Sequence, residues 1–374
     1  MYNQKVTYNN TSRTWTYEPL KYWPNGKDAG NTSTPSNSAT EANKQYLSFF
    51  AYAPYAEKVK IDDTEYSLDV TSGEFKNEDN NYSSRNEAFG ITKFTNNTQT
   101  GAPTVTYKLA STLDAASNVD LLWGLGADAT ATTYIETDGD NKSVAVNGYN
   151  TDLTKQSTAE KVKFFFKHAL AKIGDIQAML DIDGNTETQA LDDNSNVTIQ
   201  SITISNGTNN LYSSGTLNLA TGEWSDYDYA TEGALSATIN TSTPNCNTNI
   251  IADAPTNNGT TWTTSGLSKE AQSVYAENQA PEFFLIPSSV SNQTIKVTVA
   301  YTVKTKDNNV SEGYTTTQQT ITNSVSLGQI ENNKKYSLIL HIGMTSVKFE
   351  ATVMNWDDAI GDATIWLPSN VVTE

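Results

Sequence analysis

Short alternating runs of apolar and polar residues, separated by pairs of residues that favour tight turns, constrain this chain most strongly. The turn pairs are Asn25-Gly26, Asp138-Gly139, Asp183-Gly184, Asn206-Gly207, Ser214-Gly215, Thr221-Gly222 and Asn258-Gly259. Two-residue hairpins need such pairs because glycine, asparagine and aspartate adopt positive φ at little cost. Patterns with a helical period are scarce, and many strands with frequent turns are typical of β-sandwiches. The sequence therefore predicts an all-β fold.

The segment Lys161–Ile173 is predicted to form a strong strand. Spacing at period two places Phe164, Phe166 and Leu170 on one face, with His168 among them. Because alternate residues of a strand point to the same side of its sheet, we expect these three apolar side chains to lie in the core.

Two other segments predict more than the presence of a strand. Leu47–Tyr52 is apolar on both faces, so we expect it in the centre of a sheet. In Val197–Ser205 the apolar residues change parity midway, which indicates a β-bulge. Further strands are expected at Lys5–Tyr8, Thr14–Tyr17, Thr104–Leu109, Asp120–Trp123, Ile295–Val303, Tyr336–Ile342 and Val347–Val353.

The length of 374 residues suggests two domains. The stretch Asn147–Ser157 is polar, lacks an apolar period and comes shortly before the strong strand from Lys161. We therefore expect an N-terminal β-sandwich domain over 1–157 and a C-terminal one over 158–374.

The charge of the chain excludes some classes of partner. It carries 42 acidic and 24 basic residues, for a formal net charge of −18. A surface of that sign repels phosphate backbones, so nucleic-acid binding is not expected. The sequence has no run of 18 apolar residues, so no membrane-spanning segment is expected. The single cysteine, Cys246, allows no disulfide within the chain.

Residues that could carry chemistry are few. Asp181–Glu187 places oxygen ligands at alternate positions, which suits Ca²⁺, but its glycine stands at the wrong position for an EF-hand, so we interpret it as a solvated hairpin loop. His168 and His341 lie in expected strands and lack the spacing of metal ligands or of a catalytic triad. We therefore predict no catalytic residue, no metal and no cofactor, and hence no enzyme.

Two tryptophans are the best candidates for a surface that stacks on a ligand. Trp224 and Trp262 lie in loop-rich, acidic surroundings. They would suit an alternative function, that of a surface glycan-binding lipoprotein. A second alternative, a secreted hydrolase, would need converging carboxylates that the sequence alone does not identify.

Four groups of short sequence strings resemble those of one known family. They are TWTYEPLKYWPNG (14–26) leading to YLSFFAYAPY (46–55), VKFFFKHALAKI (162–173), FFLIP (283–287), and KYSLILHIG (335–343) leading to VKFEATVMNWDD (347–358). In order and spacing they resemble the fimbrillins, the pilus subunits of the type V class, over most of the chain. The resemblance implies two tandem β-sandwich domains of transthyretin-like topology.

The same resemblance implies a function. Fimbrillins are exported as lipoprotein precursors to the cell surface, where they form the fimbrium and support cell adhesion. A protease removes a first strand from the N-terminal domain, and a C-terminal strand of a neighbouring copy, or of a related pilin, fills the open groove by donor-strand exchange. This chain begins almost at Lys5–Tyr8, which leaves little room for such a first strand.

The matching donor strand would lie at 361–374. Ile365, Leu367 and Val371 lie at period two and could fill successive pockets, while Trp366 and Val372 would face outward or cover the rim. Pro368, which lacks an amide donor, would suit an edge position or a kink in the strand. The alternative is a last strand packed on its own sandwich.

Overall fold

The computed structural model describes residues 2–19, 48–61, 64–79, 90–99, 101–127, 134–137, 143–146, 163–181, 195–208, 210–253, 266–276, 282–311, 313–343 and 347–356. Several residues singled out from the sequence lie outside these ranges. They are the polar stretch 147–157, the acidic loop after residue 181, Trp262, and the candidate donor residues Ile365, Trp366, Leu367, Val371 and Val372.

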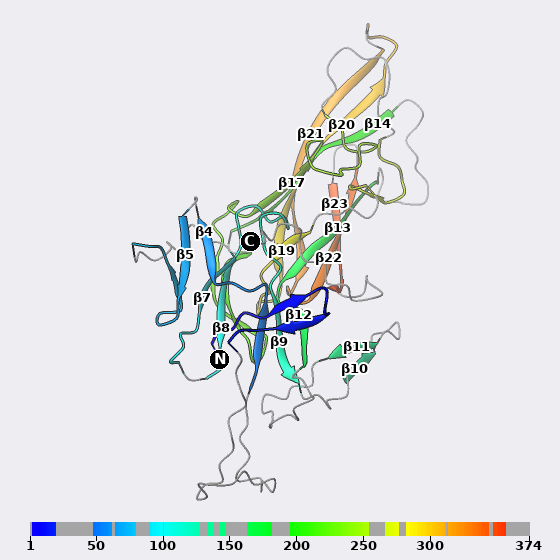
Figure 1. Cartoon of the computed structure of the whole chain (residues 1–374). Helices are drawn as coiled ribbons and strands as arrows, with labels where there is room; N and C mark the ends of the chain where they lie inside the picture. The colour runs from blue at the N-terminus through cyan, green and yellow to red at the C-terminus, as the bar shows by residue number, and fades with distance from the viewer. Residues whose placement is uncertain are drawn as a thin grey trace, which may run out of the picture.

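The described chain is built of strands and contains no α-helix, so the all-β prediction is confirmed (Figure 1). It therefore also contains no helix that could cross a membrane. Two hairpins form two-stranded sheets of their own: β1 (Thr7–Asn9) with β2 (Thr14–Thr16), and β10 (Tyr134–Thr137) with β11 (Ser143–Val146).

Two sheets form the first sandwich. A seven-stranded sheet has the order β16 (Trp224–Tyr229), β15 (Tyr212–Asn218), β8 (Thr104–Lys108), β7 (Gly90–Phe94), β6 (Glu74–Lys76), β5 (Thr64–Asp69), β4 (Lys58–Ile61). A three-stranded sheet has the order β12 (Lys163–His168), β9 (Leu122–Ala127), β3 (Phe50–Ala53). The rings of Tyr52 on β3 and Phe94 on β7 lie 5.1 Å apart, so the two sheets pack face to face.

Two further sheets form the second sandwich. One has the order β17 (Ser236–Asn240), β14 (Ser195–Asn206), β20 (Gln293–Lys306), β21 (Tyr314–Gly328). The other has the order β18 (Gln272–Ser273), β13 (Ala171–Leu180), β22 (Lys334–Ile342), β23 (Val347–Asn355), and β19 (Phe283–Leu285) also pairs with β13. The β13–β22 pair is parallel.

Alternation along the central strands places one side of each sheet in the apolar core. On β20, the side chains of Ile295, Val297, Val299 and Tyr301 are fully buried. On β22, Leu338, Leu340 and Ile342 are fully buried as well. Each such side chain contributes roughly 1.5–3 kcal/mol relative to remaining exposed, so the period-two pattern that identifies these strands also holds the sandwich together.

The bulge expected in Val197–Ser205 is confirmed. The pairing of β14 with β20 shifts register between Ile199 and Ser201. The extra residue lets Val197 and Ile199 before the shift, and Ile202 and Ile204 after it, all reach full burial. A change of apolar parity in the sequence thus has a direct structural cause.

The segment Lys161–Ile173 differs from the expectation in two ways. It forms two strands, β12 and β13, which belong to different sheets. Leu170 is buried as expected, but Phe164 and Phe166 are each 37% exposed, so their assignment to the core is wrong. They lie on the face of the three-stranded sheet opposite that of Trp123 and Leu125, which are buried in the core.

Leu47–Tyr52 was expected in the centre of a sheet, but among the described residues β3 ends the three-stranded sheet and β9 occupies its centre. Strands from both sides of the expected domain boundary also share sheets. β12 pairs with β9, and the β15–β16 hairpin adds to β8. The division at residue 157 stays a prediction.

Candidate assembly surfaces

Trp356 directly follows the end of β23 and contacts residues from several other segments. Its amide donates a hydrogen bond to the carbonyl of Asn333 at 3.0 Å. The indole is buried, with 7% of the residue exposed. It stacks on the imidazole of His168, with ring centroids 3.8 Å apart and an interplanar angle of 9°, and lies 5.9 Å from the ring of Phe284.

Charged groups flank this indole. The Lys172 Nζ lies 4.2 Å from its ring centroid and forms an ion pair with Glu282. The Nδ1 of His168 lies 2.7 Å from a carboxylate oxygen of Asp120, just before β9. Lys172 has only 9% of its side chain exposed. A cation so deeply buried needs both a carboxylate and an aromatic face, and this cluster supplies them.

The cluster of Asp120, His168, Lys172, Glu282 and Trp356 joins both sandwiches, because His168 ends β12 and Lys172 lies on β13. We call it the Trp356 anchor. The spacing of residues around His168 gives no sign of this cluster, because its partners Asp120 and Trp356 lie far away along the chain. The hydrogen bond of the Ala169 amide to the carbonyl of Leu121, at 2.7 Å, fixes the crossing between the sheets.

Trp224 does not form a ligand-stacking surface. Only 9% of the residue is exposed, and its Nε1 donates a hydrogen bond to the carbonyl of Ala169 at 3.0 Å. The indole therefore supports the β12–β13 crossing from inside the protein, and its proposed role in stacking on a ligand is wrong.

The exposed rings of Phe164 and Phe166 form an apolar strip on β12. Their centroids lie 6.4 Å apart at 27°. Directly opposite them on β9 stand Gly126 and Gly124, which have no side chains to cover the rings. We call these four residues the β12 strip.

Three tyrosines gather on β15 and β16. The ring of Tyr212 lies 4.1 Å from that of Tyr227, at 18°, and 4.7 Å from that of Tyr229. Burial, and then the neighbouring hydroxyl of Tyr229, raises the pKa of Tyr212 to about 12. Tyr229 is 46% exposed. The stacked rings use most of their faces on one another, which points to a structural role for the group.

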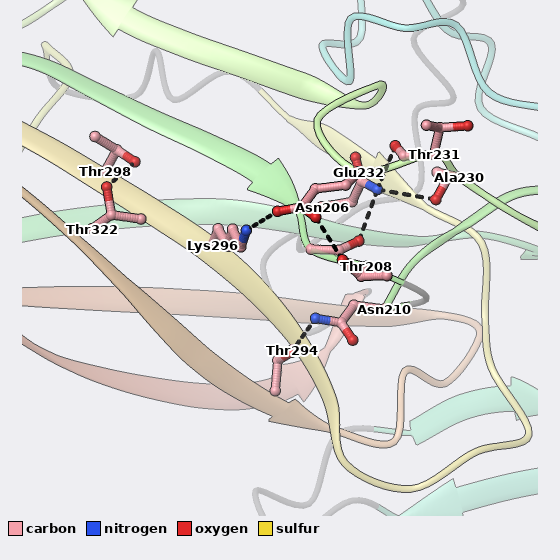
Figure 2. A network of polar contacts seen from close by, with 11 residues as sticks. Asn206, Thr208, Asn210, Ala230, Thr231, Glu232, Thr294, Lys296, Thr298 and Thr322 are labelled. Atoms are coloured by element: carbon pink, nitrogen blue, oxygen red, sulfur yellow. Dashed lines mark hydrogen bonds and ion pairs between the residues drawn. The ribbon is translucent and has the colours of Figure 1, made fainter.

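A network of polar contacts surrounds Asn206, the last residue of β14 (Figure 2). The side-chain amide of Asn206, fully buried, donates to the carbonyls of Gly207, Ala230 and Thr231, and its oxygen accepts from the amide of Leu235. Nearby, Glu232 forms an ion pair with Lys296 and accepts a hydrogen bond from Thr208 at 2.5 Å. One asparagine side chain thus bonds to four backbone groups of the surrounding loops.

Groups that could hold a metal are absent from the part of the chain that the structure describes, where no three acidic, histidine or cysteine side chains converge. Asp181, the first residue of the acidic loop, lies 3.6 Å from the Nδ1 of His341. The rest of that loop lies outside the described residues, so the structure does not test its interpretation as a hairpin.

Comparison with known proteins rests on structure. No protein-family model matches the chain, and no curated protein sequence does either. The crystal structure of a fimbrial protein from Bacteroides vulgatus is similar, with 19% identity and a TM-score of 0.57, and the match covers 95% of this chain and 85% of that one. At that identity the likeness shows a shared fold, so the β-sandwich prediction and the resemblance to fimbrillins are confirmed at the level of the fold.

Two weaker matches are described as candidate cell adhesion proteins. One, from Bacteroides uniformis, is 12% identical, covers 85% of this chain and 100% of its own, and has a TM-score of 0.30. The other, from Bacteroides ovatus, is 14% identical, covers 80% of each chain, and has a TM-score of 0.28. These scores are too low to support an argument about fold.

Proposed function

We propose that this chain is a structural subunit of a bacterial surface fimbria, which supports adhesion and has no enzymatic role. The observation that carries the proposal is the fold shared with a fimbrial protein over 95% of the chain. The four groups of sequence strings that resemble fimbrillins support it independently. Export as a lipoprotein precursor through the outer membrane belongs to the same proposal.

The subunits polymerise, in this proposal, by donor-strand exchange through residues 361–374. The segment follows closely after the Trp356 anchor, which holds the end of β23 against both sandwiches. A segment that leaves a fixed origin loses less freedom on binding than one attached to a frayed end. Ile365, Leu367 and Val371 supply the apolar side chains at period two.

The β12 strip is the acceptor that we favour for this segment. Phe164 and Phe166 are exposed, and the glycines opposite leave their rings uncovered on that side. An added strand would cover the rings and pair with the outer edge of β12, which is an end strand of its sheet. Without such a partner, exposed apolar area of this kind on a secreted protein would promote aggregation.

A peptide-binding experiment tests the donor assignment. A labelled 361–374 peptide should bind the chain truncated after residue 360, as followed by fluorescence anisotropy. Leu367→Asp in the peptide should weaken binding at least tenfold, because it places a charge among apolar side chains. Trp366→Asp, on the outward face, is the matched control and should have a small effect. Equal effects of the two substitutions, or no binding by the unmodified peptide, would refute the assignment.

A further inference from the structure

β21 is an unusually long strand at the end of its sheet. It runs for 15 residues, Tyr314–Gly328, and pairs with β20 along its length. Among the described residues, no strand pairs with its other side. Figure 1 shows the hairpin end of β20 and β21, together with β14, extending beyond the other sheets. Among the described residues, the edge is therefore accessible at this end of the strand.

The sequence of β21 lacks the features that normally protect an edge. Tyr314–Gly328 contains no charged residue and no proline, and its pairing with β20 shows a register irregularity only at the Gly328 end. Five of the six side chains of Thr315–Thr320 are exposed, on both faces of the strand. Natural edge strands are usually short, charged, bulged or interrupted by proline, because unpaired backbone groups invite another strand.

Charge makes this edge different from the rest of the chain. Residues 293–328 hold three lysines, one aspartate and one glutamate, a net charge of +1, so the remainder of the −18 chain carries −19. Two of these lysines are engaged within the chain. Lys296 forms an ion pair with Glu232, and Lys304 lies 3.6 Å from the ring centroid of Tyr314. Two copies of this acidic protein repel one another over most surfaces, but not here.

We propose that β21 is a strand-addition surface for β21 of a second copy. The two strands pair in antiparallel fashion about a twofold axis perpendicular to the sheet, centred on Gln318 within the exposed stretch Thr315–Thr320. An uncharged strand suits itself as partner, because no register brings like charges opposite each other. An acidic or basic peptide would find no counter-charge along Thr315–Thr320.

This pairing would join two four-stranded sheets into one continuous sheet. The outer faces of the two sheets have the same chemistry, because threonine hydroxyl groups line them. The Oγ1 atoms of Thr298 and Thr322 lie 2.8 Å apart, and those of Thr203 and Thr238 lie 3.0 Å apart (Figure 2 shows the former pair). A twofold pair closes on itself and forms no chain. It is therefore a lateral contact, separate from polymerisation by the C-terminal segment, and does not depend on the proposed function.

Sedimentation velocity over a concentration series tests the pairing. The full chain is measured in the presence of excess 361–374 peptide. The peptide blocks exchange of the C-terminal segment between copies, and if no such exchange occurs it has no effect on the measurement. We expect a reversible dimer. Gln318→Lys should raise its dissociation constant at least tenfold, since it places two lysines opposite each other at the axis. Thr238→Lys is the matched control, because it adds the same charge to the same face of the sheet at its opposite edge, on β17. It should change the dissociation constant of the dimer less than about twofold. A monomer at every concentration, or equal effects of both substitutions, would overturn the proposal.

Disulfide formation tests the register. In a Cys246→Ser background, Gln318→Cys should form a disulfide with itself under mild oxidation. Thr316→Cys and Thr320→Cys should each react poorly alone but readily when mixed, because an antiparallel pair centred on Gln318 places them opposite each other. Equal reaction of all three single variants with themselves would show that no such register exists.

Discussion

Removing the indole of Trp356 should destabilise the whole protein. Replacing a buried tryptophan by alanine costs about 3–5 kcal/mol. Trp356 is 7% exposed and also stacks on His168 and carries Lys172 over its ring. Such aromatic and cation–π contacts add roughly 0.5–2 kcal/mol to burial alone. We therefore expect Trp356→Ala to fall in the upper part of that range, at about 4–5 kcal/mol.

The corresponding change in melting temperature follows from the size of the chain. An unfolding entropy of about 2.1 cal/mol/K per residue gives roughly 0.8 kcal/mol/K for 374 residues that unfold together, so Tm should fall by about 5 °C. Differential scanning calorimetry measures this directly. Trp15→Ala is the matched control, because Trp15 is 63% exposed and its replacement should lower Tm by less than about 1 °C. Equal shifts for the two variants would refute the burial of Trp356 in the anchor.

Three further outcomes are expected. Leu170→Ala should cost about 2–5 kcal/mol in denaturant melts and Phe166→Ala about 1 kcal/mol, because the first side chain is fully buried and the second is 37% exposed; the reverse order would contradict the assignment of the two faces. Asn206→Ala should cost about 2–4 kcal/mol, since it leaves buried backbone groups without partners, and a neutral effect would exclude that role. Burial raises the pKa of Tyr107, and that of Tyr212 to about 12, so the folded state should lose stability as pH rises from about 10 through 12; phenolate absorbance that reaches the full value for all 19 tyrosines near pH 10 while the protein stays folded would contradict this.

The positions of several strands were predictable from the local spacing of their apolar residues, as for β20 and β22, whereas other strands, such as β7 and β15, were not expected. The parity change in Val197–Ser205 predicted a bulge, and the register shift after Ile199 confirms it. The faces of β12 were not predictable in the same way. Alternation separates Phe164 and Phe166 from their neighbours, but it does not say which face another sheet will cover. In this protein the core lies on the side of Trp123 and Leu125.

Long-range pairing was also beyond the sequence. The β15–β16 hairpin adds to β8, more than a hundred residues earlier, because of packing that no local pattern encodes. The Trp356 anchor likewise gathers side chains from Asp120 to Trp356. Each of these residues looks ordinary in its own segment, and their chemistry arises only where the segments meet.

The central claim is that copies of this chain assemble into a filament through residues 361–374. Negative-stain electron microscopy of the full chain and of the chain lacking 361–374 tests it most directly, with circular dichroism and Tm used to show that both are folded. We predict filaments from the full chain and folded single particles from the truncated one. Filaments that persist after the deletion, or a full chain that stays monomeric under every condition of processing and concentration, would contradict the claim.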